Sequence, residues 1–280
     1  MKYFDTHAHY NDEVYNDNLQ EVLEKCRQAN VKYIVNIGYN KESSIKAIEL
    51  SKKYKNMYAV IGVHPHDVNK DNAKDIYDIY NKCNVKENIV AIGEIGLDYA
   101  FVKDNKEAQS KLFIEQINLA NSLKLPIVVH TREASLDTYK VLIENKPKYG
   151  ALLHCFKPTD DLMKLVLNEG YYVAFGGNIT YKRSKSFSDY VYQIPNERLL
   201  IETDCPYLAP IPFKGEINDS SHLDIICKKL AEYKKMEEEE LAQILFKNSI
   251  KFYNIKTQKD WNPIVFFCVF NEAKLRLYNY

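Results

Sequence analysis

Residues 126–132 read PIVVHTR, a short and almost continuous apolar run that ends at His130. Runs of this kind, which lack an alternation of apolar and polar residues, are typical of strands buried on both faces of a parallel sheet. Seven further runs occur along the chain: KYFDTHAH (2–9), VKYIVNIG (31–38), MYAVIGVH (57–64), NIVAIGEI (88–95), GALLHCF (150–156), YYVAFGG (171–177) and LLIETDCP (199–206). The sequence therefore predicts eight parallel strands.

The segments between these runs have the spacing of amphipathic helices. Residues 17–30 place Leu19, Val22 and Cys26 on one helical stripe, and residues 160–170 end at Gly170, as helices often do. Strand and helix alternating eight times predict an α/β fold, a (β/α)8 barrel of the TIM type. An open doubly wound sheet is the alternative, but its GxGxxG signature does not occur in the chain.

The barrel is expected to occupy residues 1–255 as a single domain. Two extra C-terminal helices are expected at about 222–234 and 238–253. Residues 256–280 form a C-terminal extension whose role the sequence leaves open. Its apolar run IVFFCVF, residues 264–270, is too short to span a membrane and could pack on the barrel or mediate association.

Charge and cysteine content limit the class of protein. The chain has 38 Lys and Arg residues and 38 Asp and Glu residues, whereas proteins that hold DNA by charge alone are usually basic. Its six cysteines lie far apart with no CxxC pair, as is typical of reduced thiols. There is no secretory pattern and no membrane-length apolar run. We expect a cytoplasmic or nuclear protein without a membrane partner.

Ionisable side chains stand at the ends of six of the eight predicted strands. In a (β/α)8 barrel the carboxyl ends of the strands meet on one face, where catalytic groups lie. His7 and His9 end the first strand and share one face because they are two residues apart. The other strand-end groups are His64, Glu94, His130, His154 and Asp204. Divalent transition metals accept imidazole and carboxylate ligands, so this pattern predicts a metal centre.

Seven motifs identify a family resemblance over residues 3–255: DTHAHY, GVHPH, GEIGLDY, PIVVHTREA, HCF, GGNIT and ETDCPYLAPIP. Together they resemble the TatD-type metal-dependent deoxyribonucleases of the amidohydrolase-like barrel superfamily. The resemblance implies two divalent metal ions that share Glu94 as a bridging carboxylate. The implied ligands are His7, His9, Glu94 and Asp204 for one ion, and Glu94, His130 and His154 for the other. It also implies that Asp204 accepts a proton; Zn, Mg and Mn all stay open as the metal.

Other polar residues are candidates for supporting roles. Asp5 is expected to fix a histidine tautomer or to form a buried ion pair, and Glu202 is expected in a buried polar network behind the site. Substrate contacts are expected from His64, Arg132 and Lys214. For Arg132, a phosphate contact and a surface salt bridge are equally compatible with the sequence.

Cations and aromatic rings are also expected at the catalytic face. The cations follow strands six to eight and are Lys157, Lys182, Arg183, Lys185 and Lys214. The tyrosines are Tyr10, Tyr99, Tyr181 and Tyr207. A ring that stacks on an unpaired base adds about 1–3 kcal/mol, although core packing explains tyrosines equally well. The chain departs from the family at Lys157-Pro158, where Ser-Gly is usual, and in the loop around Lys214.

The resemblance favours a nuclease that hydrolyses DNA phosphodiester bonds. A 3′–5′ exonuclease acting on single strands or 3′ ends is implied by the family alone. A metal-dependent amidohydrolase, lactonase or aminoacyl-tRNA deacylase is the alternative, because one scaffold hosts many chemistries. A non-catalytic binding protein is a third hypothesis, against which the complete set of ligand residues argues. Oligomeric state is left open.

Overall fold

The computed structural model describes residues 1–101 and 105–256, except for the side chains of residues 183–185. Eight strands form one parallel sheet in the order β1-β2-β3-β4-β5-β6-β7-β8, so each strand pairs with the next along the chain. The strands are β1 (Tyr3–Ala8), β2 (Val31–Ile37), β3 (Met57–Ile61), β4 (Ile89–Asp98), β5 (Ile127–Arg132), β6 (Ala151–Leu153), β7 (Tyr172–Phe175) and β8 (Leu199–Ile201). The predicted (β/α)8 barrel is confirmed.

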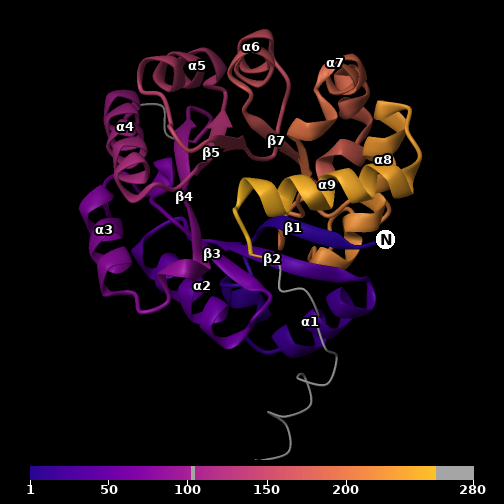
Figure 1. Cartoon of the computed structure of the whole chain (residues 1–280), viewed down its shortest axis with the longest axis horizontal. Helices are drawn as coiled ribbons and strands as arrows, with labels where there is room; N and C mark the ends of the chain where they lie inside the picture. The colour runs from indigo at the N-terminus through magenta and orange to yellow at the C-terminus, as the bar shows by residue number, and fades with distance from the viewer. Residues whose placement is uncertain (102–104, 257–280) are drawn as a thin grey trace, which may run out of the picture.

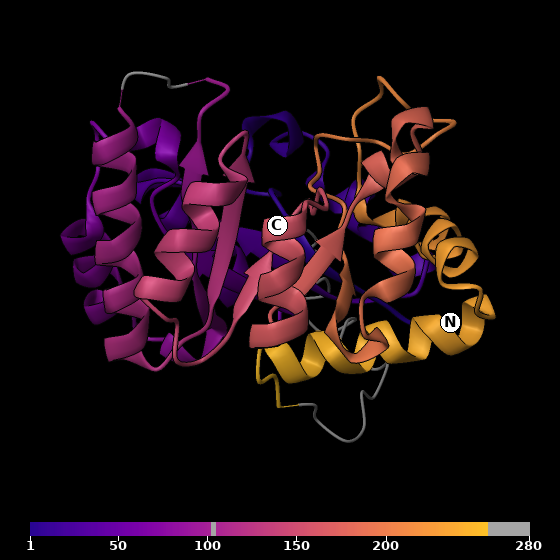
Figure 2. The same ribbon diagram turned by 90° about the horizontal axis from the view of Figure 1, so that it is seen from above.

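Helices surround the strands on the outside of the barrel (Figure 1). They are α1 (Leu19–Gln28), α2 (Lys41–Lys53), α3 (Ala73–Lys82), α4 (Lys106–Leu123), α5 (Ser135–Glu144), α6 (Asp160–Glu169), α7 (Ser188–Gln193), α8 (Leu223–Lys234) and α9 (Glu238–Phe252). The two late helices expected from the sequence correspond to α8 and α9. Unlike the others, α9 lies across the barrel at the end where the strands begin (Figure 2).

Apolar side chains inside the barrel pack against the end of α9. Val35, Val128 and Leu200 come from three different strands and belong to one buried cluster with Phe252 and Tyr253. Burying a side chain of this size contributes roughly 1.5–3 kcal/mol to folding. This end of the barrel is therefore closed by packing, and the polar groups of the interior lie toward the opposite end.

Strand lengths differ from the predicted ones at that opposite end. β3, β6 and β8 stop before His64, His154 and Asp204, which stand in the loops directly after these strands. β4 runs past Glu94 and ends at Asp98. The prediction that the fourth strand ends at Glu94 is therefore wrong, and its last residues bring a further carboxylate to the same face.

Gly96 allows this extension of β4. It pairs with His130 on β5 and has a φ of +147°, in the region that favours glycine. A Cβ at this position would lie 1.9 Å from the backbone oxygen of His130. The absent side chain thus lets β4 and β5 approach closely, with Glu94 and His130 on adjacent strands.

Hydrogen bonds join the first and last strands at the polar end of the barrel. The backbone N–H of Asp204 donates to the carbonyl of His7 at 2.9 Å, and the N–H of His9 donates to the carbonyl of Cys205 at 2.8 Å. Asp204 has a φ of +55°, a conformation that Asp tolerates better than most residues. These bonds fix the carboxylate of Asp204 beside the two N-terminal histidines.

The predicted C-terminal extension, residues 256–280, lies outside the described residues from Thr257 onward. Within the part of the chain that is described, none of the helices has the length and apolar character needed to cross a membrane.

Candidate metal centre

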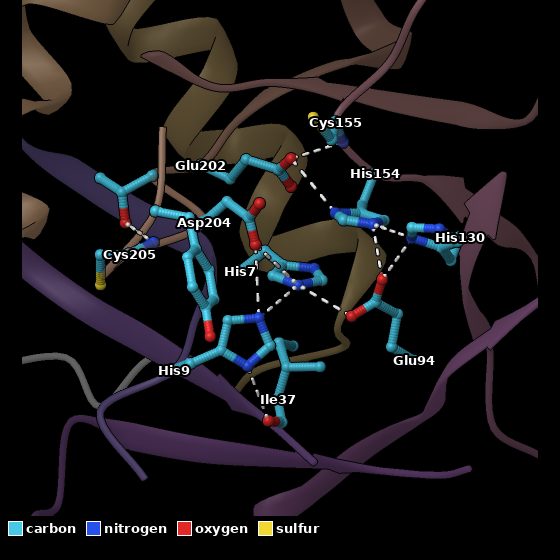
Figure 3. Close-up of polar contacts among 12 residues, drawn as sticks. His7, His9, Ile37, Glu94, His130, His154, Cys155, Glu202, Asp204 and Cys205 are labelled. Atoms are coloured by element: carbon cyan, nitrogen blue, oxygen red, sulfur yellow. Dashed lines mark hydrogen bonds and ion pairs between the residues drawn. The ribbon is translucent and has the colours of Figure 1, made fainter. Parts of the chain in front are cut away.

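The six predicted metal ligands converge at the carboxyl ends of the strands (Figure 3). His7 is fully buried, and His9, Glu94 and His154 are at least nine-tenths buried. Burying an ionisable group costs free energy unless the group is paired or binds a metal ion. Each of these side chains is therefore expected to have an ionic partner or a bound cation. Their ligand atoms fall into two clusters.

The first cluster combines side chains from the end of β1 and from the loop after β8, which are the first and last strands of the sheet. The Nε2 atoms of His7 and His9 lie 3.2 Å apart. Asp204 Oδ1 lies 3.5 Å from His7 Nε2 and 3.3 Å from His9 Nε2. Glu94 Oε2 completes the group at 3.5 Å from His7 Nε2.

The second cluster lies on the other side of Glu94. Its Oε1 is 2.8 Å from His130 Nδ1 and 2.7 Å from His154 Nε2. These two nitrogens are 3.3 Å apart. The two oxygens of one carboxylate therefore face different clusters, which is the arrangement that a carboxylate shared between two cations requires.

The spacing of the ligand atoms fits divalent ions. Ligands bound at about 2.1 Å lie about 3.4 Å apart around a tetrahedral ion and about 3.0 Å apart around an octahedral one. The measured separations are 3.2–3.5 Å in the first cluster and 2.7–3.3 Å in the second. Both clusters therefore need little rearrangement to hold an ion.

Two of the imidazoles are oriented by hydrogen bonds on their outer nitrogens. His9 Nδ1 lies 3.1 Å from the carbonyl oxygen of Ile37, which can only accept. His130 Nε2 lies 3.0 Å from Asp98 Oδ2. When both rings are protonated, their inner nitrogens donate to Asp204 and Glu94. When the rings are neutral, the remaining proton is held on the outer nitrogen, which leaves the lone pair on the nitrogen that faces the cluster, as metal binding requires.

The carboxyl groups of the site are ionised. Burial acts to raise the pKa of Glu94, but the attraction of His154 and His64, together with hydrogen bonds from neighbouring imidazoles, holds it well below its usual range. Burial likewise acts to raise the pKa of Asp204, but the hydrogen bond with His9 and the attraction of His7, His154 and His9 together outweigh it, so that this pKa is also lowered. Both side chains are thus available as anionic ligands.

The negative potential of these carboxylates acts on the imidazoles in turn. Burial acts to lower the pKa of His154, but the charge of Glu94, followed by the close carboxylate of Glu202, raises it well above its usual value. A potential that favours a protonated imidazole at this point also favours a cation between the ligand atoms.

Comparison with known proteins identifies the family. The sequence profile described as TatD related DNase matches residues 4–254. The chain belongs to the TatD family. It is 38% identical over 253 residues to the uncharacterized metal-dependent hydrolase YabD of Bacillus subtilis, covering 90% of this chain and 99% of the relative. It is 31% identical over 259 residues to the uncharacterized metal-dependent hydrolase YcfH of Escherichia coli, covering 91% of this chain and 97% of YcfH.

Solved structures of TatD proteins have the same fold. The TatD homologue YjjV of Escherichia coli superimposes with a TM-score of 0.84 at 27% identity, covering 91% of this chain and 98% of YjjV. A TatD family hydrolase of Entamoeba histolytica gives a TM-score of 0.80 at 25% identity, covering 90% of this chain and 98% of the hydrolase. The family resemblance inferred from the motifs is confirmed.

Asp98 is a further residue of the site in this TatD protein, and it was not predicted from the sequence. Its Oδ2 lies 3.0 Å from the Nε2 atoms of both His130 and His66. Asp98 is fully buried. It could have been found from its spacing, because Glu94, Gly96 and Asp98 alternate along one strand and so share a face.

Asp5 does not have its expected role. Its carboxylate accepts hydrogen bonds from the backbone N–H of Thr203 at 3.0 Å, from the Thr203 hydroxyl, and from Ser220 Oγ at 2.6 Å. No imidazole ring or cation is among its hydrogen-bond or ion-pair partners in the described part of the chain, so both expected roles are wrong. Burial raises the pKa of Asp5 to about 7, and the hydroxyl donors offset only part of the increase. Asp5 instead ties β1 to the loop after β8.

Glu202 lies behind the second cluster, in the buried position expected for it. Its Oε1 is 3.5 Å from His154 Nδ1 and accepts a hydrogen bond from the backbone N–H of Cys155. Burial raises the pKa of the Cys155 thiol to about 12, so this thiol is neutral near pH 7. A thiolate ligand or nucleophile at Cys155 is therefore not supported.

The predicted substrate contacts are spread around the opening of the site. His64 Nε2 lies 3.6 Å from Glu94 Oε1, next to the second cluster. Arg132 is exposed, and its guanidinium carbon lies 4.9 Å from the centre of the Phe101 ring. No salt bridge of Arg132 occurs among the described residues. Lys214 is exposed over Tyr181, with Nζ 4.6 Å from the ring centre.

The remaining expected cations and tyrosines differ in exposure. Lys157 and Lys182 are exposed, and the side chains of Arg183 and Lys185 lie outside the described part of the chain. Tyr207 is 55% exposed, with its ring 6.1 Å from that of His9. Tyr99 is half-buried, and its hydroxyl donates to Asp137 on α5 at 3.0 Å.

Tyr10 does not lie at the opening. It is buried, and its hydroxyl lies 2.8 Å from Ser220 Oγ. Its ring packs 4.8 Å from that of Tyr15. The expectation of a stacking role for Tyr10 is therefore wrong, because the loop after β1 turns this ring into the core.

Proposed function

We propose that this TatD protein is a metal-dependent hydrolase that cleaves DNA phosphodiester bonds, acting as a 3′–5′ exonuclease on single strands or 3′ ends. The observation that carries the proposal is the orientation of Glu94, whose two oxygens face separate clusters of ligand atoms. The direction of attack rests on the family resemblance alone.

The two clusters are the proposed binding sites for two divalent ions, with Zn, Mn and Mg as candidates. The first ion would be held by His7, His9, Glu94 and Asp204, and the second by Glu94, His130 and His154. When bound, such a pair lowers the pKa of water and neutralises charge on both oxygens of a phosphodiester displacement.

Asp204 is the proposed proton acceptor. Its carboxyl group is ionised and partly exposed, and it lies beside His7 and His9 in the first cluster. A positioned carboxylate of this kind accepts a proton from attacking water and contributes about 10²–10⁴-fold to the rate.

His64 is the proposed hydrogen-bond donor to the phosphate or to the leaving oxygen. Burial lowers its pKa well below the usual value, so the ring is neutral at pH 7. The backbone N–H of His66 donates to His64 Nδ1 at 3.1 Å, so the ring proton is on Nε2. This N–H points toward the second cluster, where it can reach an oxygen of the substrate.

Metal removal provides the direct test. The purified chain is stripped with EDTA and then given Zn, Mn or Mg together with an end-labelled single-stranded oligodeoxynucleotide. We expect at least one ion to raise the cleavage rate by about 10²-fold or more, because two-metal catalysis contributes several kcal/mol. The position of the label in the products distinguishes cleavage that starts at the 3′ end from cleavage within the strand.

A parallel set of esters, lactones, amides and an aminoacyl-tRNA tests the competing substrate class. Hydrolysis of one of these with a divalent ion, while DNA stays intact with every ion, would overturn the nuclease proposal. Exposed Arg132 favours phosphate, because a guanidinium group matches its geometry.

The Asp98→Asn variant tests the proposed second metal site. Removing the charge behind His130 weakens the imidazole as a ligand, and losses of this kind usually reduce metal affinity 10–100-fold. We expect a loss of that size for one ion only, measured by titration with Zn against a coloured chelator. Asp161→Asn on the surface of α6 is the control. Equal affinities in Asp98→Asn and the unmodified chain would rule out this role for Asp98.

A further inference from the structure

The loop after β4 carries an exposed aromatic ring beside the second cluster. Phe101 is 68% exposed, more than any other large hydrophobic residue noted in the described part of the chain. Its ring centre lies 5.1 Å from that of His66, which stands against Asp98. A phenylalanine this exposed contributes little to the core, and its ring contacts residues of the site.

Asp98 fixes the backbone of Phe101 relative to the proposed metal ligands. Its Oδ1 accepts hydrogen bonds from the N–H groups of Ala100 at 2.9 Å and Phe101 at 3.1 Å. Its Oδ2 faces His130 and His66, as described above. One buried carboxylate thus positions both a proposed metal ligand and the exposed ring.

Arg132 lies against the same ring. Its guanidinium carbon is 4.9 Å from the ring centre of Phe101, and Asp98 pairs with Arg132 in the register of β4 and β5. A guanidinium group stacked on an aromatic ring keeps its N–H edge available for phosphate. With most of Phe101 exposed, surface of the ring is still open to a second flat group.

We propose that Phe101 and Arg132 form a platform for one unpaired nucleotide, with its base stacked on Phe101 and its phosphate contacting Arg132. This inference rests on the proposed nuclease function, and it specifies an unpaired strand as the substrate. Aromatic stacking suits any base, because every base presents a π face. A chain of zero net charge depends on such local contacts to hold a nucleic acid.

The test measures KM and kcat for a short single-stranded oligodeoxynucleotide and for a set that carries one abasic residue at each position in turn. We expect Phe101→Ala to raise KM roughly 10-fold for the intact strand with little change in kcat. Phe101→Trp is expected to retain the KM of the unmodified chain. Against the strand that lacks the stacked base, Phe101→Ala and the unmodified chain should have equal KM values.

Leu167→Ala is the control, because Leu167 is 49% exposed on α6. Equal KM values for Phe101→Ala and the unmodified chain on the intact strand would overturn the platform while leaving the nuclease proposal intact. The platform is also overturned if Phe101→Ala raises KM, relative to the unmodified chain, by the same factor for every abasic strand.

Binding distinguishes a failure of the platform from a failure of the proposed function. If no DNA is cleaved with any ion, the nuclease proposal fails, and the affinity for the same strands is measured by fluorescence anisotropy. A roughly 10-fold weaker Kd for Phe101→Ala on the intact strand alone supports the platform. Equal Kd values, or no binding by the unmodified chain, overturn it.

Discussion

Glu94→Gln is expected to reduce the metal content to one ion per chain at most and to lower kcat by about 10³-fold, equivalent to roughly 4 kcal/mol of transition-state stabilisation. Each oxygen of Glu94 faces one cluster of ligand atoms. A glutamine amide offers one oxygen and one NH2 group, and the NH2 group cannot bind a cation. The substitution therefore disables one cluster and leaves the other a neutral oxygen in place of an anionic one, while preserving the volume of the side chain.

Metal analysis by mass spectrometry and turnover on the oligodeoxynucleotide check this prediction. Glu144→Gln, at an exposed position near the end of α5, is the matched control and should leave both quantities unchanged. Retention of two tightly bound ions by Glu94→Gln would contradict the bridging role. It would show that the two clusters do not depend on a shared carboxylate.

Asp204→Asn is expected to lower kcat by about 10³-fold while the second cluster keeps its metal ion. The variant removes the proposed proton acceptor and one anionic ligand of the first cluster. Asparagine tolerates the positive φ of Asp204, so the backbone conformation should be preserved. The loss of activity is therefore not expected to come from misfolding.

The two variants differ in the ion that they lose, which makes the comparison informative. Asp204→Asn should weaken the first site alone, whereas Glu94→Gln affects ligands of both. Thermal unfolding checks that each variant is folded, and the exposed Asp17→Asn change serves as a control for Asp204→Asn. Unchanged turnover in Asp204→Asn would remove Asp204 from the mechanism.

The fold could be predicted because strands buried on both faces are almost continuously apolar. The helices between them instead have apolar residues at helical spacing. The exact strand ends could not be predicted in this way. β4 remains fully buried from Ile89 to Asp98, so its polarity pattern does not mark where pairing with β5 stops. That uncertainty is why Asp98 was missed, although Glu94 on the same strand was found.

The convergence of the six proposed ligand residues could be predicted because the fold brings strand ends together and the family motifs name the residues. The carboxylates behind them could not be assigned to particular histidines. Asp5 shares a strand face with His7, yet it meets only the backbone N–H of His7, and its other partners are Thr203 and Ser220. The choice of partner depends on side-chain placement across strands, which the alternation of residues along one strand does not determine.

The hydrogen bonds between β1 and the loop after β8 affect when the protein becomes active during its synthesis. His7 and His9 are translated near the start, whereas Asp204 follows only when the last strand has been made. The nascent chain therefore cannot assemble the first cluster until nearly the whole barrel has left the ribosome and its ends have met. Such distant pairing forms slowly compared with local contacts. On this basis, partial translation products that lack the last strand cannot form the first cluster.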